Sequence, residues 1–104
     1  MIHTNAATAE EFVPLGDGGT VSWVRQDEDV RAGTCVYMLT EAGDPHEIDV
    51  SGSETLLVLE GRLRFEIADG PSFELGPGES VSFEQGTVGS WSLVEDAKLF
   101  FVAT

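Results

Sequence analysis

The most constraining feature of this sequence is a strict alternation of apolar and polar residues over 62–68. Leu63, Phe65 and Ile67 form one face of this segment, and Arg64 and Glu66 form the other. A period of two is typical of a β-strand with one buried face. Similar short runs recur at 21–24, 34–40, 47–50, 55–59, 73–75, 81–83, 91–93 and 98–103. About nine short strands with no helical stretch between them predict an all-β fold, an antiparallel sandwich or barrel.

Clusters of glycine, proline and acidic residues separate the runs. They predict turns at Glu60-Gly61, Asp69-Gly70-Pro71, Gly76-Pro77-Gly78 and Glu95-Asp96, among others. The runs 55–59 and 98–103 are apolar on both faces. Such strands fit a barrel that packs its interior and also buries part of its exterior, so we expect a homodimer.

The first 19 residues differ from the rest of the chain. Thr8-Ala9-Glu10-Glu11 matches the capping-box pattern and predicts a short N-terminal helical turn that ends at Pro14. We therefore expect a peripheral N-terminal segment over 1–19 and a single barrel domain over 20–104, since 104 residues suffice for one core. The N-terminus has neither a basic start nor an apolar segment, so no signal peptide is expected. No apolar run is long enough to span a membrane.

Charge narrows the range of partners. Nineteen acidic residues stand against five basic ones, for a formal net charge of −14. Such a surface repels phosphate backbones and anionic lipids, so neither nucleic acid nor a membrane is an expected partner. Cys35 is the only cysteine and lies in an apolar run, which predicts a buried, unreactive thiol. A chain without disulfides fits a reducing cytoplasm.

Two stretches between Gly43 and Gly89 resemble the cupin motifs. In the first, Glu54 is followed by TLLVLE and then Gly61, and LLVLEGRLRFEI reads as a strand, a glycine turn and a returning strand. In the second, GPGESVSFEQGTVGSW contains the glycine-acid opening, an apolar strand and the Gly86 turn. The ending GSWSLVEDAKLFFVA is similar to a metal-poor subgroup that includes relatives of the ethanolamine-utilisation and ureidoglycine-aminohydrolase cupins. The resemblance covers residues 33–103 and implies an antiparallel double-stranded β-helix, the jelly-roll or cupin barrel.

The resemblance also implies where metal ligands belong, and most are missing. Glu54 keeps its place, but the first histidine pair is replaced by Glu47 and Asp49 in one register or by Ile48 and Val50 in the other. Gly89 stands in place of the histidine of the second motif. A transition metal prefers imidazole or thiolate ligands, so we expect no metal and no cofactor. A carboxylate-rich substitute set would consist of His46, Glu47, Asp49 and Glu54.

Glu54 is the strongest candidate for chemistry. It shares its strand face with Leu56 and Val58, which the resemblance directs into the barrel. A carboxyl group in an apolar interior has a raised pKa and can act as a general acid or base. The alternative is a structural carboxylate bonded to turn amides or to Arg62 or Arg64. Aromatic side chains could line a ligand pocket, which we predict to contain Trp23, Tyr37, His46, Glu54 and Trp91.

Three functions remain open at this point. The first is a metal-free small-molecule-binding domain that acts as a sensor, carrier or accessory protein. The second is an isomerase, lyase or hydrolase that acts on a small polar metabolite, with Glu54 as the catalytic acid or base. The third is an interaction scaffold without catalysis. A fold resemblance alone does not choose among them.

Overall fold

The computed structural model describes residues 3–6, 11–42, 45–50 and 52–104, with only the backbone described at Ala42 and Asp49. The described chain is almost entirely β-structure, as the alternating pattern predicts. Its elements are β1 (Val13–Pro14), β2 (Gly19–Gln26), β3 (Arg31–Tyr37), α1 (Leu39–Ala42), β4 (His46–Asp49), β5 (Glu54–Ile67), β6 (Ser72–Leu75), β7 (Ser80–Phe83) and β8 (Val88–Ala103).

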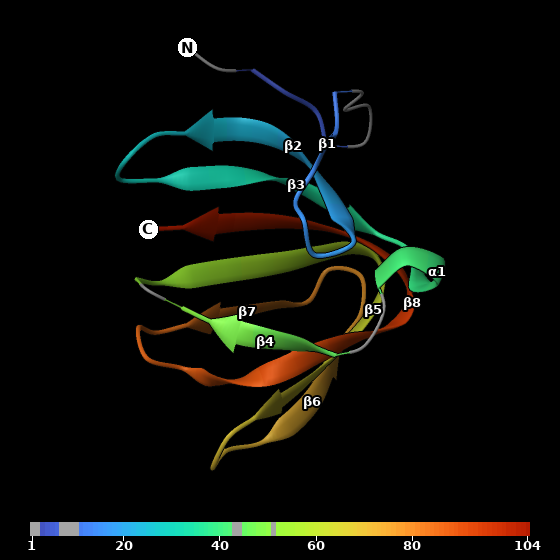
Figure 1. The fold of residues 1–104 in the computed structure, drawn as a ribbon, viewed down its shortest axis with the longest axis vertical. Helices are drawn as coiled ribbons and strands as arrows, with labels where there is room; N and C mark the ends of the chain where they lie inside the picture. The colour runs from blue at the N-terminus through green and yellow to red at the C-terminus, as the bar shows by residue number, and fades with distance from the viewer. Residues whose placement is uncertain (1–2, 7–10, 43–44, 51) are drawn as a thin grey trace.

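Two long, bent strands organise the barrel. β5 and β8 pair antiparallel along most of their lengths and pass from one layer to the other (Figure 1). The first part of β5 pairs with β7 and the second part with β6, while the first part of β8 pairs with β4 and the last part with β3. One layer therefore contains β1, β2, β3 and β7 beside halves of the long strands, and the other contains β4 and β6. All of these pairings are antiparallel, as the resemblance to the cupins implies.

The bends replace two of the predicted turns. Glu60-Gly61 and Glu95-Asp96 lie inside β5 and β8, where the pairing register shifts between Val58 and Leu63. Gly61 has φ +82°, and a Cβ at this position would overlap the carbonyl oxygen of Asp96. Glycine is needed here because it tolerates both the positive φ and the close approach of the two backbones. The polar and glycine residues at these two positions therefore mark a bulged corner within a long strand and not a hairpin turn.

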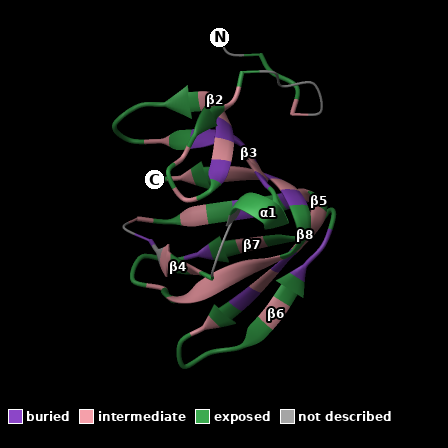
Figure 2. Ribbon diagram, turned by 45° about the vertical axis from the view of Figure 1, so that its right-hand side comes forward, coloured by how far each residue is buried: buried purple, intermediate pink, exposed green. Residues whose placement is uncertain are grey.

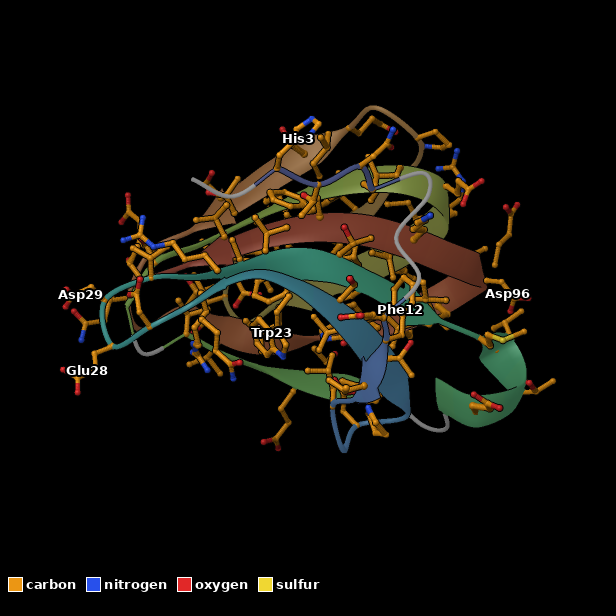
Figure 3. All side chains as sticks on the ribbon, turned by 90° about the horizontal axis from the view of Figure 1, so that it is seen from above. His3, Phe12, Trp23, Glu28, Asp29 and Asp96 are labelled. Atoms are coloured by element: carbon orange, nitrogen blue, oxygen red, sulfur yellow. The ribbon has the colours of Figure 1, made fainter. Side chains whose placement is uncertain are left out.

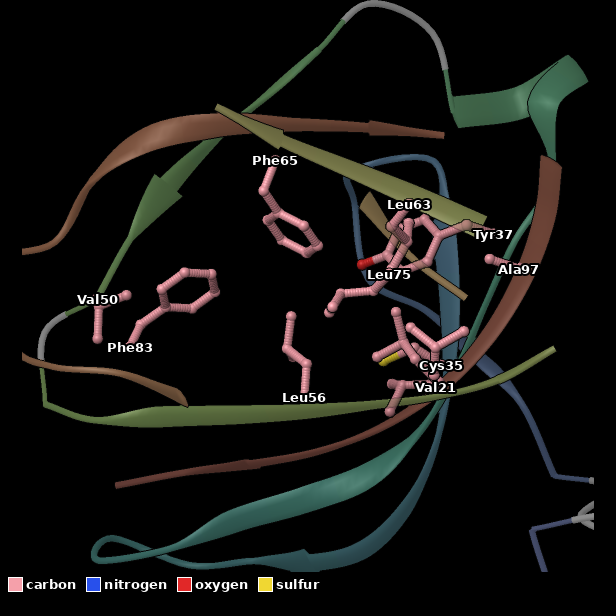
Figure 4. Packing of buried hydrophobic residues seen from close by; sticks show 12 residues of the cluster. Val21, Cys35, Tyr37, Val50, Leu56, Leu63, Phe65, Leu75, Phe83 and Ala97 are labelled. Atoms are coloured by element: carbon pink, nitrogen blue, oxygen red, sulfur yellow. The ribbon is translucent and has the colours of Figure 1, made fainter. Parts of the chain in front are cut away.

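The core lies between the two layers. Leu63 and Phe65 are each 1% exposed and Val58 is fully buried, whereas the β2–β3 and β5–β6 turns are exposed (Figure 2). Leu56 and Phe65 extend into the interior from opposite sides, with Phe83 beside them (Figure 4). The predicted apolar face of 62–68 is thus the buried face. This burial supplies most of the favourable free energy of folding.

Helical structure is limited. The four-residue helix α1 follows β3, at a place where the sequence analysis expected none. The helical turn predicted at Thr8–Glu11 falls mostly on residues 7–10, which lie outside the described residues, and Pro14 pairs with Thr20 as part of β1. In the described part of the chain, no helix is long and apolar enough to cross a membrane.

Candidate ligand-binding site

A cavity of about 250 Å³ opens into the barrel. Its walls come from β2, β3, β5 and β8 and from the turn before β2. Apolar side chains form most of the lining, and the polar and aromatic groups are Asp17, Trp23, Arg31, Tyr37, Glu54 and Trp91. Small-molecule sites have this composition, an apolar wall with a few polar groups that fix the orientation of the ligand.

Glu54 begins β5 on the inward face. It is half-buried, and among the described residues no hydrogen bond or ion pair engages its carboxyl group. Burial raises the pKa of Glu54 above its usual range, and the positive charge of Arg31 opposes this shift. Arg62 and Arg64 pair instead with Glu66 and Glu74. The structural pairing of Glu54 with an arginine, which the sequence left open, is therefore absent from the described contacts.

Arg31 lies two strands away from Glu54 in the same cross-strand row. Ala103 of β8 pairs with Arg31 on one side and with Glu54 on the other. Neighbouring strands are about 4.8 Å apart, so the two backbone positions are separated by about 10 Å. The methyl group of Ala103 leaves the space between the two longer side chains open. Within the described chain, Arg31 has no ion pair or hydrogen bond of its own.

Tyr37 and Asp17 form a fixed polar contact in the cavity wall. The Tyr37 hydroxyl donates to Asp17 Oδ2 at 2.9 Å, and the Gly19 amide donates to Asp17 Oδ1 at 3.0 Å. Burial, reinforced by nearby negative charge, raises the pKa of Tyr37 well above its usual range. Tyr37 is consequently a neutral hydrogen-bonded phenol that shapes the wall.

Three aromatic rings stack at the boundary of the cavity. Trp91 contacts Tyr37 edge-on, with ring centroids 4.8 Å apart, and stacks on His46 at 4.3 Å with a 22° angle between the planes. His46 is half-buried on the inward face of β4. His46 lies behind Trp91 and lines neither cavity, and its Nε2 is buried with no hydrogen-bond partner in the described structure. Trp23 of β2 lines the main cavity, and its ring meets Phe101 edge-on. Figure 3 labels Trp23 among the side chains drawn on the ribbon.

A second, smaller cavity of about 160 Å³ adjoins the main cavity at Glu54. It shares Glu54, Leu56, Phe65 and Trp91 with the main cavity and is also bordered by Glu47, Ile48 and Phe83. Cys35 lines the main cavity but is 3% exposed, and burial raises the pKa of its thiol to about 12. A thiol in this state is not a nucleophile at neutral pH.

Comparison with known families agrees with this architecture. A profile of the EutQ-like cupin domain matches residues 27–98, which is more than half of the chain. The chain belongs to this cupin family. No curated protein matches the chain significantly.

Solved structures share the fold of this cupin. A protein of unknown function from Rhizobium leguminosarum bv. viciae 3841 is 24% identical with a TM-score of 0.74, over 99% of this chain and 95% of that one. A putative ethanolamine utilization protein Q from Salmonella typhimurium LT2 is 14% identical with a TM-score of 0.72, over 88% and 76%. Hydroxypropylphosphonic acid epoxidase from S. wedmorenis is 17% identical with a TM-score of 0.76, over 100% and 59%. These similarities establish the fold.

The positions of the cupin metal ligands do not suit a transition metal in this chain. On β4, His46 and Ile48 are half-buried and Glu47 is exposed. Of the two registers for the first histidine pair, the inward one therefore contains Ile48 and Val50, which have no ligand atoms. At the position of the second-motif histidine, Gly89 lies so close to β5 that a Cβ would overlap the carbonyl oxygen of Glu66. Only Glu54 supplies a ligand atom, and a transition metal needs several.

The substitute set is also dispersed. His46 stacks on Trp91, Glu47 is exposed on the opposite face of β4, and Glu54 lies across the smaller cavity. The side chain of Asp49 lies outside the described residues. Within the described part, no group of three His, Cys, Asp or Glu residues is arranged to hold a metal ion.

The structure brings four of the five predicted pocket residues to one cavity: Trp23, Tyr37, Glu54 and Trp91. Sequence reasoning did not find Asp17 and Arg31. Arg31 could have been found from its parity, because residues 31, 33, 35 and 37 share one face of β3 with the buried Cys35 and Tyr37. Asp17 lies in a glycine-rich turn, and nothing in the sequence connects this turn with Tyr37.

Proposed function

We propose that this cupin binds a small organic molecule in its main cavity and does so without a transition-metal centre. The observation that carries the proposal is the cavity of about 250 Å³, which has aromatic walls and two uncommitted polar groups, Arg31 and Glu54. This volume lies below the roughly 300–1,000 Å³ of pockets that hold drug-sized ligands, so the ligand is a compact metabolite. A sensor, carrier or accessory role fits such a site.

A ligand screen tests this proposal. We expect compact sugars, carboxylic acids or aromatic metabolites to raise Tm in a thermal-shift assay. A genuine cavity ligand will also move the indole N–H signals of Trp23 and Trp91 in a ¹⁵N–¹H correlation spectrum. The two indoles are the only ones in the chain, so their signals report directly on the cavity. Binding that leaves both signals unchanged would exclude the cavity as the site.

Metal content provides a second test. Untagged protein incubated with Mn, Fe, Ni, Zn or Mg should contain well below one metal per chain by elemental mass spectrometry. One bound metal per chain, lost in Glu54→Ala but kept in the control Glu28→Ala at an exposed position outside both cavities, would contradict the metal-free proposal.

A catalytic role for Glu54 is the second candidate, and one observation favours it. The raised pKa of a carboxyl group that borders both cavities is the property of a general acid or base. The same fold also occurs in an enzyme, since one structural neighbour is an epoxidase. If a cavity ligand is chemically altered by the wild type, the Glu54→Gln variant should bind it and not alter it. Turnover that persists in Glu54→Gln would remove Glu54 from the catalytic role.

Homodimer formation is part of the proposal. The outer surface exposes apolar side chains on two paired strands, with Leu57 of β5 at 37% and Val102 of β8 at 36%, and Phe100 lies opposite Leu57. A second copy would remove this surface from water. Sedimentation analysis should give twice the chain mass, and Leu57→Lys should shift the equilibrium to monomer. A wild-type protein that sediments as a monomer at high concentration would contradict this expectation.

A further inference from the structure

Two polar side chains face the main cavity with no protein partner in the described structure. Arg31 comes from the start of β3, and Glu54 comes from the start of β5. The other charged group in the wall, Asp17, is fully engaged by Tyr37 and by the Gly19 amide. A ligand therefore meets one free guanidinium and one free carboxyl group.

The row of cross-strand neighbours fixes the spacing of these two groups. Arg31, Ala103 and Glu54 lie side by side on β3, β8 and β5, and all three line the cavity. The small Ala103 separates two long side chains whose backbones are about 10 Å apart.

We propose that the cavity binds a compact monocarboxylate whose head group lies between Arg31 and Glu54 and whose body packs against Trp23 and Phe101. This inference rests on the proposed binding function and names its ligand class. Arg31 supplies the planar fork of donors that matches a carboxylate. Burial raises the pKa of Glu54, so this carboxyl group takes up a proton more readily than an exposed one and can then donate to the same carboxylate.

The apolar part of the ligand has a defined place. Trp23 and Phe101 meet edge-on with centroids 5.8 Å apart beside the Arg31 row, and both line the cavity. The pairing register of β2 and β3 shifts between Trp23 and Arg25, which marks a bulge next to Trp23. Bulges redirect side chains, and this one adjoins the residue that forms the apolar wall.

The net charge of −14 acts against any anion at long range. Physiological salt limits this field to a Debye length of about 8 Å. Arg31 is the one cation that lines the main cavity within the described chain, and it acts at contact distance. The contact with Arg31 therefore decides the preference for a carboxylate head group.

Three probes with a shared phenyl ring test the head group: benzoate, benzamide and benzylamine. Binding is followed through the indole N–H signals of Trp23 and Trp91. We expect benzoate to bind at least about tenfold more tightly than the other two, as an ionic hydrogen bond in a cavity allows. If benzamide or benzylamine binds most tightly, the carboxylate inference fails and the binding function stands. If none of the three binds, the inference fails, and the wider ligand screen decides the function separately.

Variants with matched controls locate the head group. Arg31→Gln should weaken benzoate binding at least about tenfold, whereas Arg64→Gln, the same charge change outside the cavity, should stay within about twofold. Glu54→Gln mimics the protonated carboxyl group and should stay within about threefold. The dispersion of each variant's spectrum shows whether the variant folds. If Arg31→Gln does not fold, Arg31→Lys takes its place, because it keeps the positive charge and removes only the planar fork of donors. Benzoate binding that is unchanged in both Arg31 variants would overturn the inference.

Discussion

At the residue scale, the unusual feature of this protein is the carboxyl group of Glu54, which borders a largely apolar cavity and has no hydrogen bond or ion pair with the residues that the structure describes. Burial disfavours the charge on Glu54, and Arg31 only partly offsets this cost. The folded state therefore binds the Glu54 proton more tightly than the unfolded state. Since stability falls with pH wherever the folded state holds more protons, Glu54 destabilises the fold as pH rises above the ordinary carboxyl pKa of 4.5.

Glu54→Gln should reveal this linkage. At pH 4 the variant and the wild type should differ little in unfolding free energy, because most wild-type carboxyl groups are protonated in both states. As pH rises toward 7, the variant should become the more stable protein, since it has no charge to bury. Urea denaturation at several pH values measures the difference, and Glu84→Gln, at an exposed position outside both cavities, is the control. A difference that does not change with pH would show that Glu54 is not desolvated.

The contact between Tyr37 and Asp17 supports a second prediction. Tyr37→Phe removes the 2.9 Å hydrogen bond but keeps the ring that packs on Trp91, so it should cost about 1–2 kcal/mol. Asp17→Asn keeps an acceptor and should cost less. Because Tyr37 is the only tyrosine, phenolate absorbance reports on it alone. Asp17→Asn should lower the pKa of Tyr37 while leaving it above its usual range, and an unchanged titration would contradict the contact.

The contrast between Glu54 and Arg31 shows what residue-level reasoning could reach. Glu54 was predictable, because its own strand carries the signal: it shares parity with the buried Leu56 and Val58. The position of Arg31 in the same cross-strand row as Glu54 was not predictable, because it depends on Ala103, which lies 49 residues after Glu54 and pairs with both strands. Single-strand periodicity contains no information about which strands become neighbours.

At the scale of elements, the corners of β5 and β8 decide the shape of the cavity. Both strands cross from one layer to the other, and the backbone of Gly61 meets that of Asp96 at the crossing. The sequence marked both positions as breaks in the strand pattern. It could not distinguish a hairpin from a bulged bend, since both use glycine and polar residues, and only the pairing of 54–67 with 88–103 separates the two. The short helix α1 has no periodicity and could not be predicted.

Glycine substitutions separate the effect of the close approach from that of backbone conformation. Gly61 and Gly78 have nearly the same φ, +82° and +84°, but only Gly61 has a backbone neighbour where a Cβ would lie. Gly78→Ala should therefore cost about 1 kcal/mol for the left-handed conformation. Gly61→Ala should cost at least about 2–4 kcal/mol, because β8 must also move. Urea denaturation of both variants gives the comparison, and equal losses would mean that the corner relaxes freely.

At the scale of the whole molecule, electrostatic repulsion opposes folding. The chain carries a formal charge of −14, and its principal extents are 40 × 31 × 25 Å. At 0.01 M salt the Debye length is about 30 Å, so acidic groups on opposite sides of the molecule repel each other. At 0.15 M it is about 8 Å, and only neighbouring groups interact. The exposed ion pairs of Arg25, Arg62 and Arg64 are also screened by salt, but such pairs contribute only about 0–1 kcal/mol each.

Salt should therefore stabilise this protein. Between 0.01 and 0.15 M sodium chloride, a gain of about 1 kcal/mol from reduced repulsion corresponds to a rise in Tm of roughly 4–8 °C for a domain of this size. Potassium chloride should act equally, because the effect depends on ionic strength and not on a bound ion. Neutralising the exposed Glu28 and Asp29 as Glu28→Gln and Asp29→Asn should raise Tm at low salt and reduce its salt dependence. A Tm that falls as salt is added would mean that the arginine ion pairs contribute more to stability than the repulsion removes. The acidic surface would then not lower the free energy of unfolding.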